Sequence, residues 1–303
     1  MKQLSLGLDL DQEEEKQVKQ GDTIVVWFSC GAASSVAAKK TIEKYGDIAH
    51  VRVVNNPIKE EDDDNQRFLK DVEKWLGIEI EYAINHKFPN CSVKEVWDER
   101  KYMSGVAGAP CTQELKKKAR EQWEEENHFD WMVMGFTTEE KKRHDNFQMF
   151  ERPNLLPVLI DEGITKGDCY QILMKAGIEL PRIYKLGYPN ANCIGCVKAQ
   201  SPTYWNHVRK MHPEVFWDRA KQSREIGARL VKLHPKHVDW CYQDYHGFWW
   251  DNKSGKCLTK KDEKGRKNTP GIRIFLDELD PNIQTSRLKN LDFECGIFCE
   301  LKL

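Results

Sequence analysis

The chain has 303 residues, of which 40% are hydrophobic and 31% are charged, so it is long enough for one large or two ordinary domains with a buried core. Its formal net charge of -1 excludes a global basic field of the kind that attracts nucleic acid and leaves only local basic patches open. No apolar run approaches membrane-spanning length, and the first residues lack the pattern of a secretory signal, so we expect a cytoplasmic protein without a membrane partner.

Composition divides the chain into three regions. Residues 1–21 form a polar N-terminal tail with an acidic run from Glu13 to Glu15. Residues 22–200 alternate apolar runs with helical patterns and are predicted to form an α/β domain. Residues 201–303 are predicted to be a helical and irregular C-terminal region that ends in a cysteine-bearing tail.

Apolar runs and amphipathic stretches alternate through the second region. They predict buried strands at Thr23–Phe28, 49–55, 79–83 and 131–135, and helices from Val36 onward, at 63–76, around 93–97, at 113–127 and at 166–176. This alternation predicts a parallel sheet of Rossmann-like type, flanked by helices. Because ligands of such sheets bind beyond the carboxyl ends of the strands, Ser29, Asn55 and Gly135 are candidate site residues.

The C-terminal region is harder to interpret. Two helices are predicted at 203–212 and 213–233, separated by Pro213 at a first helical position. The residues from 236 onward are rich in tryptophan and lysine and predict no clear element. We therefore expect a mostly helical C-terminal region.

The stretch 29–35, between the first strand and the first helix, consists of small residues: Ser29, Cys30, Gly31, Ala32, Ala33, Ser34 and Ser35. Glycine and alanine let the backbone approach a ligand, the new helix offers unpaired N–H groups, and the hydroxyls add donors, so the stretch can hold a phosphate. A tight turn without a ligand is the alternative. The parallel sheet favours the phosphate and makes residues 22–200 a candidate nucleotide-binding domain.

A polar loop at 136–146 follows Gly135 and adds hydroxyls and bases at the same edge of the sheet. Its residues Glu140 and Arg143 suit a sugar or a phosphate, and an ordinary solvated loop is the alternative. Lys116, on the helix at 113–127, can neutralise a phosphate or a metal cluster, and a solvated face made by the lysine run 116–118 is the alternative.

Ten cysteines in a cytoplasmic chain indicate metal or redox chemistry rather than a disulfide framework. Cys193 and Cys196 form a Cys-x-x-Cys pair, and Cys111 lies at the mouth of a helix, where the dipole favours a thiolate. Three thiolates would hold a [4Fe-4S] cluster with one iron left open, or three of the four positions around zinc. A redox disulfide or unligated buried thiols are the alternatives.

Two cysteines, Cys295 and Cys299, lie near the C-terminus. A thiol on a terminal segment can reach into a site, which suits a nucleophile or a shuttle, and the pair can equally supply a fourth metal ligand or simply pack. Cys30, within the small-residue stretch, is small enough to replace a glycine there. The remaining cysteines show no partner pattern and are taken as structural: Cys91, Cys169, Cys241 and Cys257.

A basic segment follows two tryptophans in the C-terminal region. The stretch from Lys253 to Lys267 contains seven lysines and arginines but only two acidic residues, and Trp249 and Trp250 lie just before it. Positive charge and aromatic stacking together can engage a nucleic-acid strand, so residues 249–267 are a candidate nucleic-acid contact. A solvated loop is the alternative.

These pieces together resemble the phosphoadenosine phosphosulfate (PAPS) reductase family, within the PP-loop ATP pyrophosphatase, or adenine nucleotide alpha-hydrolase-like, superfamily. The stretch from Ser29 to Ser34 resembles a PP-loop, and Cys111 with Lys116 is similar to the family's cysteine and lysine segment. The other matches are the nucleotide loop from Gly135 to Arg143, the Cys193 and Cys196 pair, and the tail from Glu294 to Ile297. The resemblance covers residues 23–215 and the last dozen residues.

The resemblance implies an enzyme that reduces adenylyl sulfate (APS) or PAPS to sulfite through a thiosulfonate on Cys295, with a thioredoxin-like thiol donor as partner. It also implies that Cys111, Cys193 and Cys196 hold an iron-sulfur cluster. Three positions depart from the family pattern: Ala33 replaces the aspartate of ATP-cleaving members, Pro110 precedes Cys111, and Phe298 replaces a histidine. An ATP-dependent iron-sulfur sulfurtransferase that modifies tRNA or DNA is one alternative, and a zinc-stapled nucleotide-binding module without turnover is another.

Overall fold

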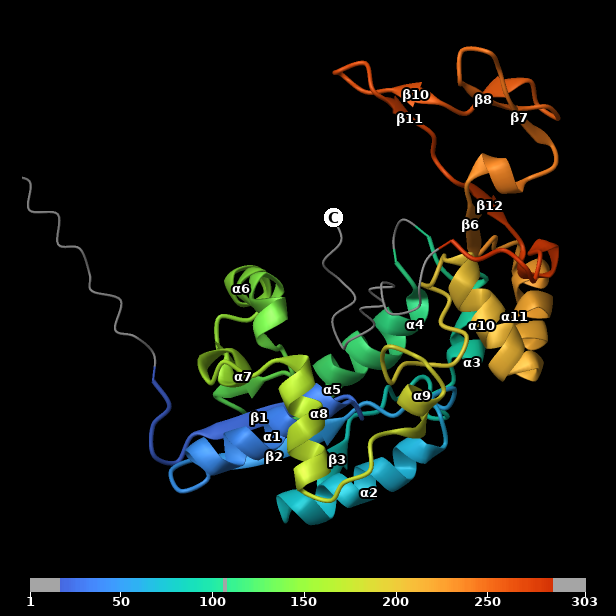
Figure 1. The fold of residues 1–303 in the computed structure, drawn as a ribbon. Helices are drawn as coiled ribbons and strands as arrows, with labels where there is room; N and C mark the ends of the chain where they lie inside the picture. The colour runs from blue at the N-terminus through green and yellow to red at the C-terminus, as the bar shows by residue number, and fades with distance from the viewer. Residues whose placement is uncertain (1–16, 106–107, 286–303) are drawn as a thin grey trace, which may run out of the picture.

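The computed structural model describes residues 17–105 and 108–285, and its centre is a five-stranded parallel sheet (Figure 1). The strands are β1 (Thr23–Phe28), β2 (His50–Asn55), β3 (Ile80–Tyr82), β4 (Trp131–Val133) and β5 (Leu155–Leu156). They lie in the order β3-β2-β1-β4-β5. The chain first adds β2 and β3 on one side of β1 and then adds β4 and β5 on the other side, so the strand order reverses between β1 and β4. The predicted Rossmann-like α/β class is confirmed.

Strand β1 runs through the middle of the sheet and is buried on both faces. Ile24, Val26 and Phe28 belong to the apolar cluster on one face, and Val25 and Trp27 belong to the cluster on the other. All five side chains are 0% exposed. A parallel sheet covered by helices on both faces requires such a continuous apolar strand, which is why the sequence identified β1 so clearly.

Helices cover both faces of the sheet. One face packs against α1 (Ala32–Tyr45), α2 (Asp64–Leu76), α7 (Val158–Asp161) and α8 (Lys166–Lys175). The other packs against α5 (Ala119–Glu126) and α6 (Lys141–Phe150), through Trp123 and Phe147. Within the described residues, no helix is both long enough and apolar enough to cross a membrane.

A second hydrophobic core lies beside the sheet and joins residues from both sides of position 200. It is built by α3 (Val93–Arg100), α4 (Pro110–Thr112), a π-helical turn (Gln113–Lys118), α9 (Arg182–Lys185), α10 (Pro202–Met211) and α11 (Pro213–Ile226). Trp97, Trp205 and Phe216 are among its largest buried side chains. Cys193 and Cys196 pack against this core or within it.

Short antiparallel strands follow α11. β6 (Val231–Leu233) pairs with β12 (Ile272–Ile274) against the second core. Between them lie a sheet of β7 (Cys241–Gln243), β8 (Trp249–Asp251) and β9 (Lys256–Cys257) and a hairpin of β10 (Lys260–Lys261) and β11 (Lys267–Asn268). We call residues 241–268 the arm, and Figure 1 shows it standing away from the rest of the molecule. Short 3-10 turns lie at Thr138–Glu140, Pro235–His237 and Leu276–Glu278.

Among the differences from the predicted α/β elements, two concern the residues that follow β1 and β4. Helix α1 begins at Ala32 rather than at Val36, so Ala32 to Ser35 form its first turn instead of a connecting loop. The predicted loop at 136–146 contains a 3-10 turn and most of α6, which buries only His144 and Phe147. A helix with so narrow an apolar stripe gives no periodic signal in the sequence.

The C-terminal helices also differ from the prediction. The helix predicted at 213–233 ends at Ile226, because Gly227 adopts a left-handed conformation with a φ of 82°. Residues 231–233 form β6 instead. The predicted helix at 113–127 begins with the π-helical turn (Gln113–Lys118) and continues as α5 to Glu126.

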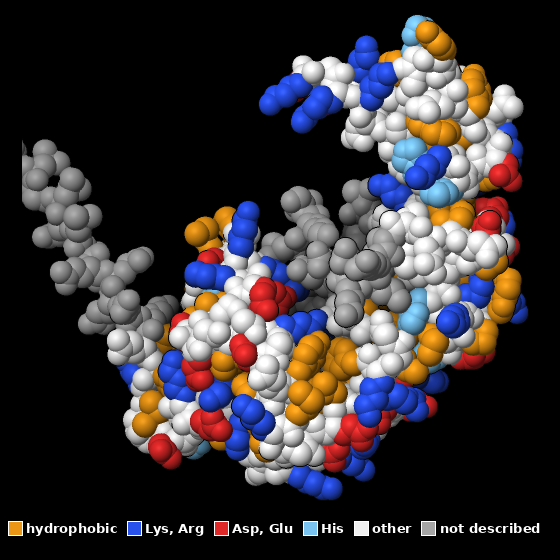
Figure 2. Space-filling view, in the orientation of Figure 1, with side chains coloured by type: hydrophobic (Ala, Val, Ile, Leu, Met, Phe, Trp, Pro, Cys, Tyr) orange, Lys and Arg blue, Asp and Glu red, His pale blue; other side chains and the backbone are white. Residues whose placement is uncertain are grey.

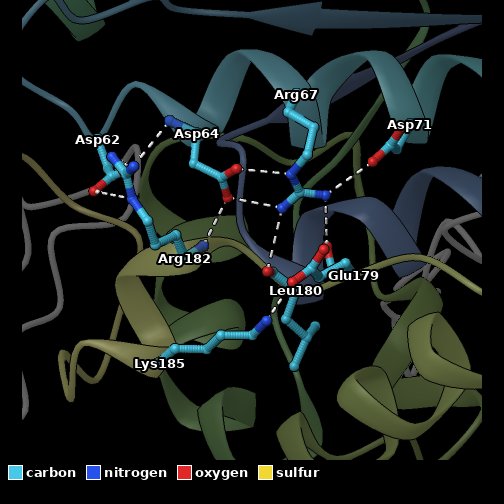
Figure 3. A network of polar contacts seen from close by, with 8 residues as sticks. All are labelled: Asp62, Asp64, Arg67, Asp71, Glu179, Leu180, Arg182 and Lys185. Carbon is cyan, nitrogen blue, oxygen red and sulfur yellow. Dashed lines mark hydrogen bonds and ion pairs between the residues drawn. The ribbon is translucent and has the colours of Figure 1, made fainter.

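An ion-pair network fixes the segment before α9 to α2 (Figure 3). Arg67 Nε and Nη2 donate to the two carboxylate oxygens of Asp64, each at 2.7 Å, and Nη1 donates to Asp71 at 2.8 Å. The same guanidinium donates to the backbone oxygens of Glu179 at 3.0 Å and Leu180 at 3.3 Å. Arg67 therefore pairs with carboxylates on its own helix and holds a distant backbone segment.

Arg182, the first residue of α9, completes the network. Its backbone N–H donates to Asp64 at 2.7 Å, and its guanidinium pairs with the buried carboxylate of Asp62 at 2.7 Å. Hydrogen bonds from Arg67 hold the pKa of Asp64 below its usual value. The network sets the position of α9 on the sheet.

Replacing Arg67 with methionine should lower the free energy of unfolding by about 2 kcal/mol at pH 7, because charge-assisted hydrogen bonds to two carboxylates and two carbonyls are lost. The pKa of Asp64 is lowered in the folded state, so its contribution is present above the usual aspartate pKa and disappears as the pH falls through the folded value. The difference between Arg67→Met and wild type should therefore shrink between about pH 5 and pH 3.

Denaturant unfolding at pH 7, 5 and 3 measures this difference. Lys70→Met, at an exposed position of the same helix, is the matched control and should change stability by less than about 0.5 kcal/mol. A pH-independent difference between Arg67→Met and wild type would contradict the assignment to Asp64.

Candidate nucleotide and thiol site

The turn after β1 is made of Ser29, Cys30 and Gly31, and α1 starts directly after it. Cys30 has a φ of 54°, in the left-handed region that glycine adopts most easily. Its side chain is 4% exposed, and burial, then the charge of Glu61, raise the pKa of its thiol, while Lys116 opposes them. Cys30 thus occupies a glycine-type position, in agreement with the prediction, and its thiol is protonated at neutral pH.

The serine hydroxyls of the turn brace its backbone. Ser34 Oγ accepts the N–H of Ser29 at 3.1 Å and donates to the carbonyl of Gly31 at 3.0 Å. Ser35 Oγ donates to the same carbonyl at 2.9 Å. These bonds fix the first turn of α1 and aim its N-terminus, whose dipole favours an anion, past the end of β1. Direct nucleotide contacts by the serines stay a prediction.

Residues from the two neighbouring strands border the same turn. Asn55, at the end of β2, donates to the carbonyl of Phe28 at 2.8 Å and contacts Cys30 Sγ at 3.5 Å. Gly135 follows β4 and lies directly against the first turn of α1. The structure thus brings Ser29, Asn55 and Gly135 to one edge of the sheet, beside the point where the strand order reverses.

Tyr184 of α9 covers the N-terminus of α1 and was not found by sequence reasoning. A Cβ at Gly31 would lie 3.5 Å from its hydroxyl oxygen. Burial raises the pKa of Tyr184, whereas the backbone N–H groups of Ala32 and Ala191, which interact with its oxygen, lower it. A phosphate that accepts hydrogen bonds from the first N–H groups of α1 would therefore lie beside the hydroxyl of Tyr184. Only the tertiary fold reveals that contact.

A pocket beside the turn collects all three predicted metal-ligating cysteines. It encloses about 360 Å³, its open mouth included, and is lined by Ile58, Val93, Trp97, Cys111, Thr112, Lys116, Cys193, Cys196, Val197 and Lys198. Cys193 and Cys196 come from one turn, in which Gly195 has a φ of 71°. Cys111 comes from α4, more than eighty residues earlier in the chain. Lys198 was also missed, although its place two residues after Cys196 was a usable signal.

Lys116 connects the thiol pocket with the turn after β1. It lines the pocket, is 7% exposed, and lies 4.0 Å from a carboxylate oxygen of Glu61. Its charge also lowers the pKa of the Cys30 thiol. The π-helical turn around it buries three consecutive side chains, Glu114, Leu115 and Lys116.

The chemistry of the pocket fits a thiolate-bound metal group. Three thiols share it with two ammonium groups, which favour the thiolate form, and apolar side chains restrict water. The indole N–H of Trp97, a residue that lines the pocket, is buried and meets no acceptor among the described residues. Within residues 17–105 and 108–285, no three Cys, His, Asp or Glu side chains form a ready metal-binding group, so the ligand set stays a prediction.

The roles of the other predicted residues stay predictions. Glu140 and Arg143 pair with each other at 2.7 Å at the start of α6, and the Arg143 guanidinium lies 5.2 Å from the ring centroid of Phe136. Cys295 and Cys299 lie outside the described residues. Cys169 is fully buried, and burial raises the pKa of its thiol to about 12, as expected for a structural cysteine.

The sheet and the helices on its two faces define a Rossmann-like α/β fold. No protein-family model and no curated protein matches the sequence. Among solved structures, the chain is similar to the U34-tRNA thiolase NcsA from Methanococcus maripaludis with its [4Fe-4S] cluster. The identity is 12%, the TM-score is 0.37, and the match covers 75% of this chain and 76% of that chain. A likeness this distant assigns no role to any residue, so the functional argument rests on the chain's own geometry.

Gly135→Ala should destabilise the fold by about 3 kcal/mol, because the added Cβ would lie 2.6 Å from the backbone nitrogen of Ser34. Backbone cannot rotate out of the way as a side chain can. Gly167→Ala, in the first turn of α8, is the control, since its Cβ would meet only Thr165 Oγ1 at 3.6 Å. Thermal and denaturant unfolding should show a large loss for the first variant and none for the second; equal effects would contradict the close contact.

Proposed function

We propose that the chain is an enzyme that binds an adenine nucleotide beyond the ends of β1 and β4 and carries out sulfur transfer at the adjoining thiol pocket. The observation that carries this proposal is the position of Lys116, which lines the thiol pocket and acts electrostatically on Cys30 in the turn. A nucleotide phosphate at the start of α1 and a sulfur in the pocket would then share one cation. That arrangement suits chemistry on an atom activated by the nucleotide.

Cys111, Cys193 and Cys196 would hold an iron-sulfur cluster, or zinc, in this pocket. A [4Fe-4S] cluster bound by three thiolates supplies one iron with an open coordination position for a sulfur ligand. The chain's own residues orient and screen the site: Lys116 and Lys198 balance the negative charge of the thiolates, and the apolar lining limits access of water.

Sulfonucleotide reduction is the first form of this proposal. A Cys295 thiolate would attack the sulfate sulfur of adenylyl sulfate or PAPS, the S–O bond would break, and the nucleotide would leave with the bonding pair. A thiol donor of the thioredoxin class would then attack the enzyme thiosulfonate, release sulfite and end as a disulfide, with Cys299 available as a second thiol. Sulfite release, together with a mass adduct on Cys295, tests this form.

Thiolation of tRNA or DNA is the second form, and the basic, aromatic arm favours it. A carbonyl oxygen of a base would attack the α-phosphorus of ATP and release pyrophosphate. A sulfide donor would then form the C–S bond, and AMP would depart with the oxygen. Pyrophosphate release that depends on added polynucleotide, and a thiolated nucleoside in its digest, test this form.

Lys116→Met should weaken binding of ATP, adenylyl sulfate or PAPS at least tenfold, which corresponds to about 1.4 kcal/mol, because a buried cation near the phosphate site is lost. Calorimetry measures the dissociation constants. Lys118→Met, at an exposed position of the same helix, is the control and should stay within about twofold of wild type. Failure of the wild-type protein to bind any adenine nucleotide would overturn the proposed function.

Cys193→Ser and Cys196→Ser should each remove most of the iron and acid-labile sulfide from protein purified without oxygen, because serine is a poor ligand for a soft metal site. Metal analysis and a visible spectrum measure this loss. Cys257→Ser, in the arm and away from the pocket, should leave both unchanged. Zinc without sulfide in the wild-type protein would point to the zinc-stapled module, and equal metal content in all variants would rule out these ligands.

A further inference from the structure

The arm (residues 241–268) carries a charge that differs from that of the whole chain. It holds seven Lys and Arg against four Asp and Glu, whereas the chain has a net charge of -1. All seven basic side chains are exposed, and Thr259, at 6%, is the single buried residue of this fully described segment. Figure 2 shows Lys and Arg side chains along the arm, where it projects from the body of the molecule. The arm therefore has no core of its own and presents its side chains to solvent.

The acids of the arm are mostly engaged in its own turns. Asp244 accepts the indole N–H of Trp250 at 2.8 Å, and Asp251 accepts two backbone N–H groups at 2.8 and 3.3 Å. Asp262 pairs with Arg266 at 2.7 Å. Among the described residues, none of the six lysines of the arm pairs with a carboxylate. The positive charge of these lysines is therefore available to an anionic partner.

Aromatic rings lie beside some of these lysines. Tyr245 is 99% exposed and Tyr242 is 51% exposed. The Lys253 ammonium lies 4.1 Å from the ring centroid of Trp240, just before the arm, and the Lys267 ammonium lies 4.7 Å from that of Phe248. Exposed rings can stack on unpaired bases while neighbouring ammonium groups contact the backbone phosphates.

The base of the arm is tied to the core that packs against the thiol pocket. Val231 of β6 and Ile274 of β12 are opposite each other in register, and both are buried in the second core with Cys196. The backbone N–H of Lys232 donates to the carbonyl of Gln200 at 2.8 Å, four residues after Cys196. This attachment fixes the root of the arm relative to the pocket.

We propose that the arm binds an unpaired stretch of a polynucleotide. Phosphates match its lysines, and unpaired bases match its exposed rings, whereas a duplex keeps its bases stacked and offers only the phosphates. An acidic peptide would use the charge alone, without the rings. The role of this polynucleotide as a substrate rests on the second form of the proposed function. The binding of a polynucleotide to the arm is independent of it.

Fluorescence anisotropy with a labelled single-stranded oligonucleotide of 20 nucleotides, in 50 to 200 mM KCl, tests this binding. A triple variant, Lys256→Glu, Lys260→Glu and Lys264→Glu, should weaken binding at least thirtyfold at 100 mM KCl. Loss of three phosphate contacts should also reduce the slope of log affinity against log salt by about 2. Tyr245→Ala should weaken binding about fivefold with little change in that slope, because it removes a stacking surface rather than a charge.

The matched control makes the same change of charge on the body of the molecule, with Lys70→Glu, Lys74→Glu and Lys175→Glu at exposed positions of α2 and α8. It should bind the oligonucleotide within about threefold of wild type, since these lysines lie outside the arm. Equal losses in the two triple variants would overturn the proposal. So would an absence of binding by the wild-type protein, or tighter binding to phosphatidylserine vesicles than to the oligonucleotide.

Adenine nucleotide binding by the same variants separates the two proposals. The arm variant should keep the wild-type dissociation constant for the nucleotide, because the arm contributes no residue to the candidate nucleotide site. Wild-type protein that binds the oligonucleotide but no nucleotide would support the arm and refute the proposed function. Wild-type protein that binds the nucleotide but not the oligonucleotide would support nucleotide binding and refute the proposal for the arm.

Discussion

The backbone contact between Gly135 and the first turn of α1 is the constraint on which the candidate site depends. A Cβ at this position would lie within 3 Å of three backbone atoms of Ala33 and Ser34. Without a side chain there, the loop after β4 closes onto the start of α1 at the point where the strand order reverses. The hydroxyls of Ser34 and Ser35 then brace the turn from within. The helix N-terminus is held in one position before any ligand arrives, which lowers the entropic cost of binding an anion.

The coupling between the two halves of the site depends on the π-helical turn. One extra residue in that turn changes the direction of the side chains that follow, so Lys116 is buried toward Glu61 and Cys30, while Lys118, two residues later, is exposed. The irregular backbone therefore places a cation between the thiol pocket and the nucleotide turn, where either site can use it.

The sequence predicted those parts of the fold that have a strong periodic or compositional signal. β1 was clear because its five consecutive buried side chains form a continuous apolar run in the sequence. The end of α2 was clear because a glycine, Gly77, stands where the chain adopts a left-handed conformation. α6 and the strands of the arm gave no such signal, because few of their side chains reach a core. In the site, the order of Cys111, Cys193 and Cys196 anticipated the pocket that the structure forms. Tyr184 could not be predicted, because only the tertiary fold brings α9 to the start of α1, where Tyr184 also packs against Tyr170 of α8.

The positive charge of the arm shows that the near-neutral net charge of the chain does not argue against a nucleic-acid partner. A net charge of -1 argued against nucleic acid only for a uniform distribution, and the distribution is not uniform. Basic side chains are concentrated on a segment without a core, while many acids of the body, such as Asp62 and Asp64, are engaged in the network that holds α9. Screening limits the reach of a surface charge to about 10 Å at ordinary salt, so a polyanion near the arm responds to the arm and hardly to the distant body. Total charge is therefore a poor guide for this chain, and the local arrangement of charges decides which partners it attracts.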